Sequence, residues 1–465
     1  MVRLAVRVRL LAIATALSVV AAACGAAETT SESVLDSDPT TTVVDEVITE
    51  DAGEVSDVEE TTTTLAVVEP AEDLTEETAE DDGLAGASEE ENQQALVDEI
   101  TSVLADWQSE AGIPGASLSV RLPDREPINV AVGVADLTTQ DPVTTDDYFR
   151  IGSITKTMTS AVVLELVEEG LLELDEPVET YVPGWLDGHE FSDVITIRQL
   201  LDHTNGLIEF AFDPEFYSLG AERLDEALSS SEIRQFLADR DPLFEPGTAY
   251  SYETGGFVTL GDVIETVTGN TAAEELRTRI FEPAGATDIF LTPQEAAPES
   301  VVSAYGRAEL YLAGTFLIGR EDTDGLTIDT PVRPNDPVID FLGQPQALLQ
   351  SAGWTGGGIE AQLDSVSAAF GALFDGTVLT DEQIAEMTTT VFDANYGLGL
   401  GVDEIDGTQV YSHGGGVPGF RSQANYLPEH DIAWAVSANL IPLPEGSDVG
   451  ELRRALQPLL IDAAS

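Results

Sequence analysis

The chain is short of lysine, cysteine and positive charge. Its 465 residues include 19 lysines and arginines against 86 aspartates and glutamates, which gives a formal net charge of −67. Binding of nucleic acid needs a basic face, so this balance excludes nucleic acid as a partner. The one cysteine, Cys24, cannot form a disulfide within the chain. The one lysine is Lys156, and the other 18 basic residues are arginines.

The lone cysteine follows an N-terminal secretion signal. Residues 1–23 carry three arginines, then an apolar stretch, then small residues. The sequence AAAC at 21–24 resembles a bacterial lipobox, in which the cysteine is lipidated and becomes the mature N-terminus, although Ala21 stands where leucine is usual. An ordinary signal peptide and an uncleaved membrane anchor are the alternatives. We expect a lipoprotein on the outer side of the cytoplasmic membrane or in the periplasm.

Residues 24–92 differ in composition from the rest of the chain. Between positions 28 and 92 there are 23 acidic residues and no basic or aromatic one. Such a segment cannot bury enough apolar surface to offset its chain entropy, so we predict a disordered tether. Residues 93–465 are then one folded domain. Its remaining acidic excess goes beyond what solubility needs and is typical of proteins from a salty habitat.

Hydrophobic periodicity predicts the elements of this domain. Helices are expected at 91–112, 154–170 and 449–464, and strands at 115–122, 128–136, 396–402, 408–415, 422–428 and 432–439. The part from about 160 to 310 is rich in helices. We therefore predict an α+β fold: an antiparallel sheet built from both ends of the domain, flanked by helices, with an inserted helical subdomain.

The single lysine stands three residues after a serine, in RIGSITKTMT at 150–159. Ser153 and Lys156 share one face of a helix that starts near the serine. The helix N-terminus offers positive potential to a developing oxyanion, and an amine whose pKa is lowered by burial accepts the serine proton. The alternative is structural: Ser153 only caps the helix, and Lys156 is solvated.

Four further segments accompany this motif in order. They are LLDHTNGL at 200–207, PGTAYSYETGGFVTLGDVIETVTG at 246–269, RIFEPAGATD at 279–288 and HGGGVPGF at 413–420. Together with SITK they resemble the serine β-lactamase and penicillin-binding protein superfamily. The branch is the one that holds class C β-lactamases, D-alanyl-D-alanine carboxypeptidases and related esterases. The resemblance covers most of 93–440 and implies the β-lactamase/transpeptidase-like fold.

The resemblance also implies roles for individual residues. Ser153 matches the acylated nucleophile, Lys156 its partner base, and Tyr252 the tyrosine that passes the proton to the leaving group. The third motif of the branch, on a strand beside the nucleophile, is matched by His413, Gly414, Gly415 and Gly416. Because these glycines lack side chains, a substrate backbone can pair along that strand.

The sequence departs from the family pattern at two places. Thr254 replaces the asparagine of the Tyr-x-Asn motif, and one hydroxyl replaces an amide that had both a donor and an acceptor. Thr254 is expected at a substrate-binding position, so this replacement leaves it undecided whether the protein turns over β-lactams. Asn205 replaces a serine, which we interpret as a structural change. His203 is predicted to hydrogen-bond the backbone of a loop. Tyr250 is the nearest alternative to Tyr252 as the catalytic tyrosine.

Other catalytic patterns are missing from the sequence. There is no G-x-S-x-G elbow, and the four histidines and one cysteine lack the spacing of a zinc site. GWTGGG at 353–358 lacks the lysine of a phosphate loop, and we expect it to turn before a helix capped by Asp364. We predict no metal and no cofactor.

These observations predict a secreted, lipid-anchored serine hydrolase that forms an acyl-enzyme on Ser153. Its substrate is a small molecule or peptide with an amide or ester: a D-Ala-D-Ala-type peptide such as one derived from peptidoglycan, a β-lactam or a small acyl ester. The alternative is a non-catalytic binding module of the cell envelope that keeps the fold.

The lipid anchor gives the first testable prediction. Cys24→Ser should release the protein from the membrane fraction or leave the signal uncleaved, because the thiol that carries the lipid is gone. Fractionation and the intact mass of the purified protein measure both. A mature chain that begins at another residue and carries no acyl mass would contradict the prediction.

Overall fold

The computed structural model describes residues 89–213, 215–216, 226–298, 301–307, 338–340, 346–441 and 448–465. The predicted signal, Cys24 and the tether as far as residue 88 lie outside the described residues. Residues 91–465 belong to one compact unit. In the part that is described, no helix combines the length and the apolar character needed to cross a membrane.

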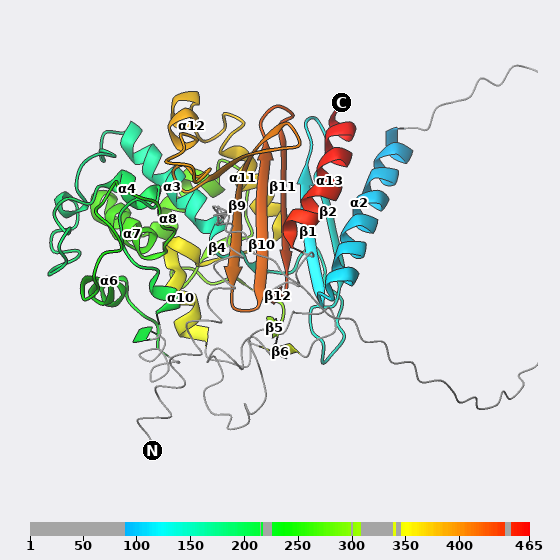
Figure 1. Cartoon of the computed structure of the whole chain (residues 1–465). Helices are drawn as coiled ribbons and strands as arrows, with labels where there is room; N and C mark the ends of the chain where they lie inside the picture. The colour runs from blue at the N-terminus through cyan, green and yellow to red at the C-terminus, as the bar shows by residue number, and fades with distance from the viewer. Residues whose placement is uncertain are drawn as a thin grey trace, which may run out of the picture. The chain divides into compact units, whose positions relative to one another are not determined.

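A six-stranded antiparallel sheet lies at the centre of this unit (Figure 1). Its strands are β1 (Gly115–Arg121), β2 (Ile128–Gly133), β8 (Gly401–Ile405), β9 (Thr408–Val417), β10 (Phe420–Leu427) and β11 (Ile432–Ala438). Their order is β2-β1-β11-β10-β9-β8, so strands from both ends of the domain are neighbours. Where the two ends of the domain meet, Leu118 of β1 lies opposite Val436 of β11. The predicted α+β fold with a sheet built from both ends is confirmed.

Helices cover both faces of the sheet. The two terminal helices, α2 (Glu89–Ala111) and α13 (Val449–Ala464), share one buried cluster with the strands, to which Leu104 and Leu456 belong. From the other face α11 (Leu363–Ala372) packs on β1 and β11. The strands alternate accordingly: Leu118 belongs to the first cluster, whereas Ser119 hydrogen-bonds Ser367 of α11. This alternation fixes the register, since a slip of one residue would turn each side chain to the wrong face.

The remaining helices lie on the β9 side of the sheet (Figure 1). The helices there are α3 (Ile154–Glu168), α4 (Ile197–Leu201), α6 (Ser230–Ala238), α7 (Gly255–Thr268), α8 (Ala272–Leu276), α10 (Gln346–Gly357) and α12 (Asp381–Met387). Short turns of helix are η1 (Val178–Thr180), η2 (Phe210–Phe212) and η3 (Arg277–Phe281). There are also two small three-stranded sheets. One has the order β3 (Phe149–Arg150), β7 (Ile359–Ala361) and β4 (Ile289–Leu291). The other has the order β12 (Leu440–Ile441), β5 (Tyr305–Arg307) and β6 (Val338–Asp340).

Two helix boundaries differ from the sequence predictions. α2 begins at Glu89, so the acidic run that we placed at the end of the tether forms its first turn, where carboxylates are favoured by the helix dipole. α11 begins after Gln362, and Asp364 is not its cap. The Asp364 carboxylate instead pairs with Arg121 of β1 at 2.8 Å.

The predicted strand at 396–402 is wrong over most of its length. Strand β8 begins at Gly401, and the preceding residues make only the isolated bridge between Tyr396 and Gly401. Gly399 has a φ of +69°, a left-handed conformation that an extended strand does not contain. The apolar alternation of this segment therefore marks a buried turn.

Helix α3 is held against strand β9 by two close backbone approaches. Gly152, just before the helix, has a φ of +54°, and a Cβ there would lie 2.9 Å from the backbone nitrogen of Gly416. A Cβ on Gly415 would lie 1.9 Å from the carbonyl oxygen of Ile151. Both positions therefore require glycine, and they bring the start of α3 to the C-terminal end of β9.

This contact predicts a position-specific loss of stability. Gly415→Ala should lower the free energy of unfolding by about 1–3 kcal/mol or more, because backbone must move to admit the methyl group. Gly414→Ala is the matched control: its Cβ would meet only the ends of the Arg421 and Gln423 side chains, at 3.2 Å. Thermal and urea denaturation measure the difference. Equal stability of the two variants would show that β9 and α3 are not in this contact.

Candidate active site

Ser153 lies at the start of α3 with its hydroxyl free of any capping role. Gly152 turns the chain sharply between β3 and α3, and Ser153 is the N-cap residue with a φ of −64°. Its side chain makes no capping hydrogen bond. The hydroxyl instead lies 3.2 Å from Nζ of Lys156. The interpretation of Ser153 as only a helix cap is therefore wrong.

Lys156 is fully buried, with a relative exposure of 0%. Its Nζ lies 2.8 Å from the carbonyl oxygen of Gly356 and 3.3 Å from Oγ1 of Thr254, in addition to Ser153 Oγ. The ammonium group has three hydrogens, so each has an acceptor. The interpretation of Lys156 as a solvated residue is also wrong.

Tyr252 is the tyrosine that faces the lysine. Lys156 Nζ lies 5.0 Å from the centroid of the Tyr252 ring, which is 6.2 Å from the ring of His413. The competitor Tyr250 has its ring contacts with His203 and Tyr396, and burial raises its pKa. The structure thus places the ring of Tyr252, and not that of Tyr250, beside Lys156.

Thr254 connects the lysine to a carboxylate that sequence reasoning missed. Thr254 Oγ1 donates to Oε2 of Glu209 at 2.8 Å, and Lys156 donates to the same hydroxyl. Glu209 Oε1 accepts the backbone N–H of Ala211 at 2.9 Å. Burial, with a smaller contribution from Glu253, raises the pKa of Glu209 to about 7, and the charge of Lys156 opposes this rise.

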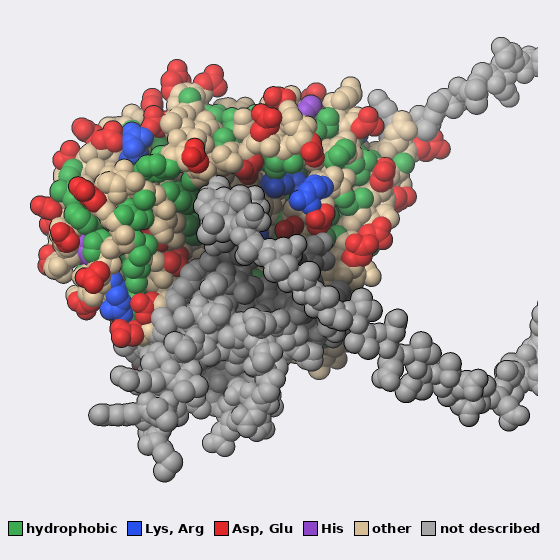
Figure 2. All heavy atoms as spheres, in the orientation of Figure 1, with side chains coloured by type: hydrophobic (Ala, Val, Ile, Leu, Met, Phe, Trp, Pro, Cys, Tyr) green, Lys and Arg blue, Asp and Glu red, His purple; other side chains and the backbone are tan. Residues whose placement is uncertain are grey.

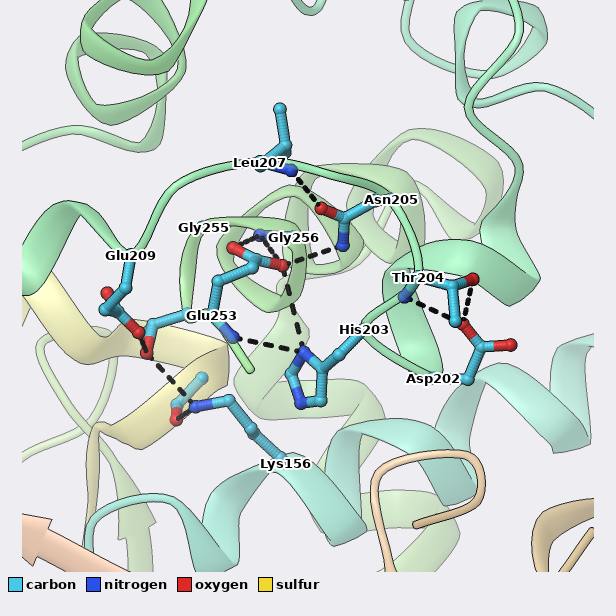
Figure 3. A network of polar contacts seen from close by, with 12 residues as sticks. Lys156, Asp202, His203, Thr204, Asn205, Leu207, Glu209, Glu253, Gly255 and Gly256 are labelled. Carbon is cyan, nitrogen blue, oxygen red and sulfur yellow. Dashed lines mark hydrogen bonds and ion pairs between the residues drawn. The ribbon is translucent and has the colours of Figure 1, made fainter. Parts of the chain in front are cut away.

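A second carboxylate, Glu253, is buried behind the site. It accepts the N–H of Gly256 at 2.8 Å and the side-chain amide of Asn205 at 3.0 Å (Figure 3). Asn205 in turn accepts the N–H of Leu207. Burial raises the pKa of Glu253 to about 7, against these hydrogen bonds and the charge of Lys156. The change at Asn205 is structural, as the sequence predicted.

Two buried histidines are joined through Tyr396, another residue that sequence reasoning missed. The Tyr396 hydroxyl lies 2.9 Å from Nε2 of His413 and 3.3 Å from Nε2 of His203. His413 Nδ1 lies 2.7 Å from the carbonyl oxygen of Gly414, and the N–H of Glu253 donates to His203 Nδ1 at 3.4 Å. The prediction that His203 bonds loop backbone is confirmed.

These contacts fit one set of neutral tautomers. The Gly414 carbonyl can only accept, so His413 carries its hydrogen on Nδ1 and accepts from Tyr396; Tyr396 then accepts from His203. Burial, followed by the charge of Lys156, lowers the pKa of His413 to about 3 and that of His203 well below its usual value. His413 thus supports the site as an uncharged side chain.

The glycine segment of β9 presents an edge toward the nucleophile. The pairing of β8 with β9 ends at Gly401 opposite Ser412, so residues 413–417 lie beyond it. This segment contacts the turn at Gly152. The structure therefore brings all the predicted site residues of the domain together: Ser153, Lys156, Tyr252, Thr254, His413, Gly414, Gly415 and Gly416. Their roles in catalysis stay predictions.

The missed residues differ in how visible they are in sequence. Glu253 lies inside a motif and Glu209 two residues after one, so their acidic character was a signal. Tyr396 lies in a glycine-rich segment of its own and gave none. Within the described ranges, no group of three or more His, Cys, Asp and Glu side chains is placed to hold a metal ion.

Comparison with known proteins agrees with this geometry. The family model described as Beta-lactamase matches residues 89–457. Penicillin-binding protein 4 of Amycolatopsis lactamdurans is 29% identical over 358 residues, 72% of this chain and 85% of that protein. A D-aminopeptidase of Brucella anthropi is 30% identical over 67% of this chain, but the match spans only 53% of that protein.

Solved structures show the same relationship. The D-stereospecific amidohydrolase from a Streptomyces species has a TM-score of 0.61 and 29% identity, covering 77% of this chain and 97% of that one. The D-amino acid amidase from Ochrobactrum anthropi SV3, complexed with L-phenylalanine amide, has a TM-score of 0.65 and 25% identity, covering 80% and 100%. The chain belongs to the beta-lactamase family, in the serine β-lactamase and penicillin-binding protein superfamily, and is a serine hydrolase.

The buried lysine predicts that arginine cannot replace it. Lys156→Arg should lower turnover and fluorophosphonate labelling at least about 100-fold, because a guanidinium keeps its proton and cannot act as a base. The exchange Arg279→Lys, in a partly exposed ion pair with Glu169, is the matched control and should keep full activity. Wild-type rates in Lys156→Arg would show that the lysine is not the base.

Proposed function

We propose that the protein is a secreted, lipid-anchored amide hydrolase that acts on small compounds or peptides of D-amino acids through an acyl-enzyme on Ser153. The observation that carries the proposal is the fully buried Lys156 amine 3.2 Å from the Ser153 hydroxyl. The printed names of the relatives, D-aminopeptidase, D-amino acid amidase and D-stereospecific amidohydrolase, support the amide bond and the D configuration.

The proposed acylation uses three side chains, Ser153, Lys156 and Tyr252. Lys156, as the neutral amine, takes the proton of Ser153 while Oγ forms a bond to the amide carbon. The C–N bond then breaks, and the nitrogen leaves with a proton that passes from Lys156 through Tyr252. The acyl group stays on Ser153 as an ester, so the protons balance.

The same groups carry out deacylation. A water molecule gives a proton to the base and attacks the ester carbon, and Ser153 recovers its proton as the product acid leaves. Residues 413–417 extend beyond the described pairing of β9 with β8, and this supports substrate binding, because extended substrate backbone can hydrogen-bond along a strand edge. The helix N-terminus at Ser153 favours the negative oxygen of the tetrahedral intermediate.

The location is proposed from the first 92 residues. A lipid on Cys24 holds the N-terminus at the outer side of the membrane, and the acidic segment keeps the catalytic unit away from it. The negative charge of this segment repels it from anionic lipid headgroups. The substrates are therefore extracytoplasmic, such as peptides released from peptidoglycan.

A substrate panel tests the proposed function. We expect hydrolysis of D-phenylalanine amide and D-alanine amide at least about tenfold faster than of the L forms, and loss of this activity in Ser153→Ala. The variant should fold normally, because the serine hydroxyl makes no capping bond. Ser229→Ala is a control at a true capping box and should be active but about 1 kcal/mol less stable.

The same panel separates the alternatives. It includes a D-Ala-D-Ala peptide, a small acyl ester and a cephalosporin, and preferential turnover of one of these would replace the D-amide assignment while keeping the acyl-enzyme. Binding without turnover, and no adduct with a fluorophosphonate, would instead favour the non-catalytic binding module.

A further inference from the structure

The Thr254 hydroxyl can be either a donor or an acceptor of a hydrogen bond with Lys156, and only one of these orientations suits a lysine that acts as a base. As a base, Lys156 has two N–H groups and one lone pair, and three oxygens surround it. The carbonyl of Gly356 can only accept, and Ser153 must donate to the lone pair, so Thr254 has to accept. A hydroxyl can also turn its hydrogen toward the amine. In that orientation it would compete with Ser153 for the lone pair.

Glu209 removes the competing orientation. Its Oε2 accepts the Thr254 hydrogen, with 2.8 Å between the two oxygens, and this leaves the lone pairs of Thr254 Oγ1 for Lys156. Its other oxygen accepts the N–H of Ala211 at 2.9 Å, which fixes the carboxylate at the start of η2. Two donors thus require two accepting oxygens. A carboxylate provides both, whereas an amide or a carboxylic acid turns one of its polar ends into a donor.

We propose that Glu209 is a positioning residue that holds the Thr254 hydroxyl in its accepting orientation and so keeps the lone pair of Lys156 available to Ser153. The inference rests on the proposed acyl-enzyme chemistry. The proposal explains why Thr254, which stands where the family motif has asparagine, needs a partner such as Glu209. An asparagine carbonyl would need no residue to orient it, because it has no hydrogen to turn toward the lysine.

The arrangement is sensitive to pH. The charged and titratable groups that face Glu209 are Lys156 from α3 and Glu253 from the loop before α7, while His203 and His413 are neutral because their pKa values are lowered. The pKa of Glu209 is about 7. Above this pH the carboxylate accepts from Thr254. As pH falls through 7, the acid form cannot serve both donors, and the orientation is lost.

The decisive variant is Glu209→Gln, which keeps the shape but provides one accepting oxygen. Using D-phenylalanine amide, we expect kcat of the wild type to fall as pH drops through about 7. The variant should have roughly 10- to 100-fold lower kcat at pH 8, and little further fall near pH 7. Glu245→Gln, a change of the same kind at an exposed position, is the matched control and should follow the wild type.

A purely electrostatic role predicts the opposite sign. A carboxylate near Lys156 also favours the ammonium form, so removal of its charge alone would give more of the neutral base and raise kcat. Higher kcat in Glu209→Gln would therefore overturn the proposal. So would a rise in KM alone with an unchanged pH profile, which would make Glu209 a substrate-binding residue.

The double variant Glu209→Gln with Thr254→Asn tests the route of the effect. If Glu209 acts through the threonine hydroxyl, Glu209→Gln should lower kcat less than about threefold when Thr254→Asn is already present. An equal loss in both backgrounds would show that Glu209 acts on the site by another path.

One readout does not depend on the substrate. Because the chain has a single lysine, protein labelled with 13Cε-lysine gives one side-chain signal, that of Lys156. We expect the chemical shift of this signal to change in a step near pH 7 in the wild type and in Glu245→Gln. In Glu209→Gln the size of this step should fall at least twofold. An unchanged step would assign the titration to another group, Lys156 itself or Glu253, and overturn the coupling. Absence of turnover with this coupling intact would count against the proposed function alone.

Discussion

The burial of one primary amine is the constraint on which the site depends. A buried ammonium or amine needs a partner for each polar position, since an unpaired one costs about 1–3 kcal/mol or more. The three partners of Lys156 come from three places: the first turn of α3, the loop before α7, and the end of α10 at Gly356. These elements must therefore meet, and the glycine contacts with β9 bring the substrate edge to the same point.

The use of lysine once and arginine elsewhere follows a difference in chemistry. The described arginines form ion pairs such as Arg121 with Asp364, and Arg277 with Glu295. Acidic partners for arginine are plentiful: Figure 2 shows Asp and Glu side chains spread over the coloured part of the visible face. A permanent charge suits these pairs. At Lys156 the group has to lose a proton, and arginine cannot do so.

Local pattern was sufficient for much of the fold and for the reacting side chains. The spacing of Leu96, Ile100 and Leu104 marked the buried face of α2, and ordered motifs marked Ser153, Lys156 and Tyr252. The acidic character of Glu209 beside a motif was a signal, but its pairing with Thr254, and the pairing of Tyr396 with His413, were not predictable because they are contacts between distant segments. The failed strand at 396–402 has the same origin: its apolar residues pack against the core from a turn.

The departures from the family motif are compensated in the structure. Asn205, where serine is usual, donates a hydrogen bond to Glu253, and Glu253 also accepts an N–H at the N-terminus of α7. Thr254, where asparagine is usual, has Glu209 as its acceptor. Loss of function leaves buried polar groups unsatisfied, because nothing maintains their partners. Here each altered group has a partner, and this favours an adapted active site over a binding module that has lost its chemistry.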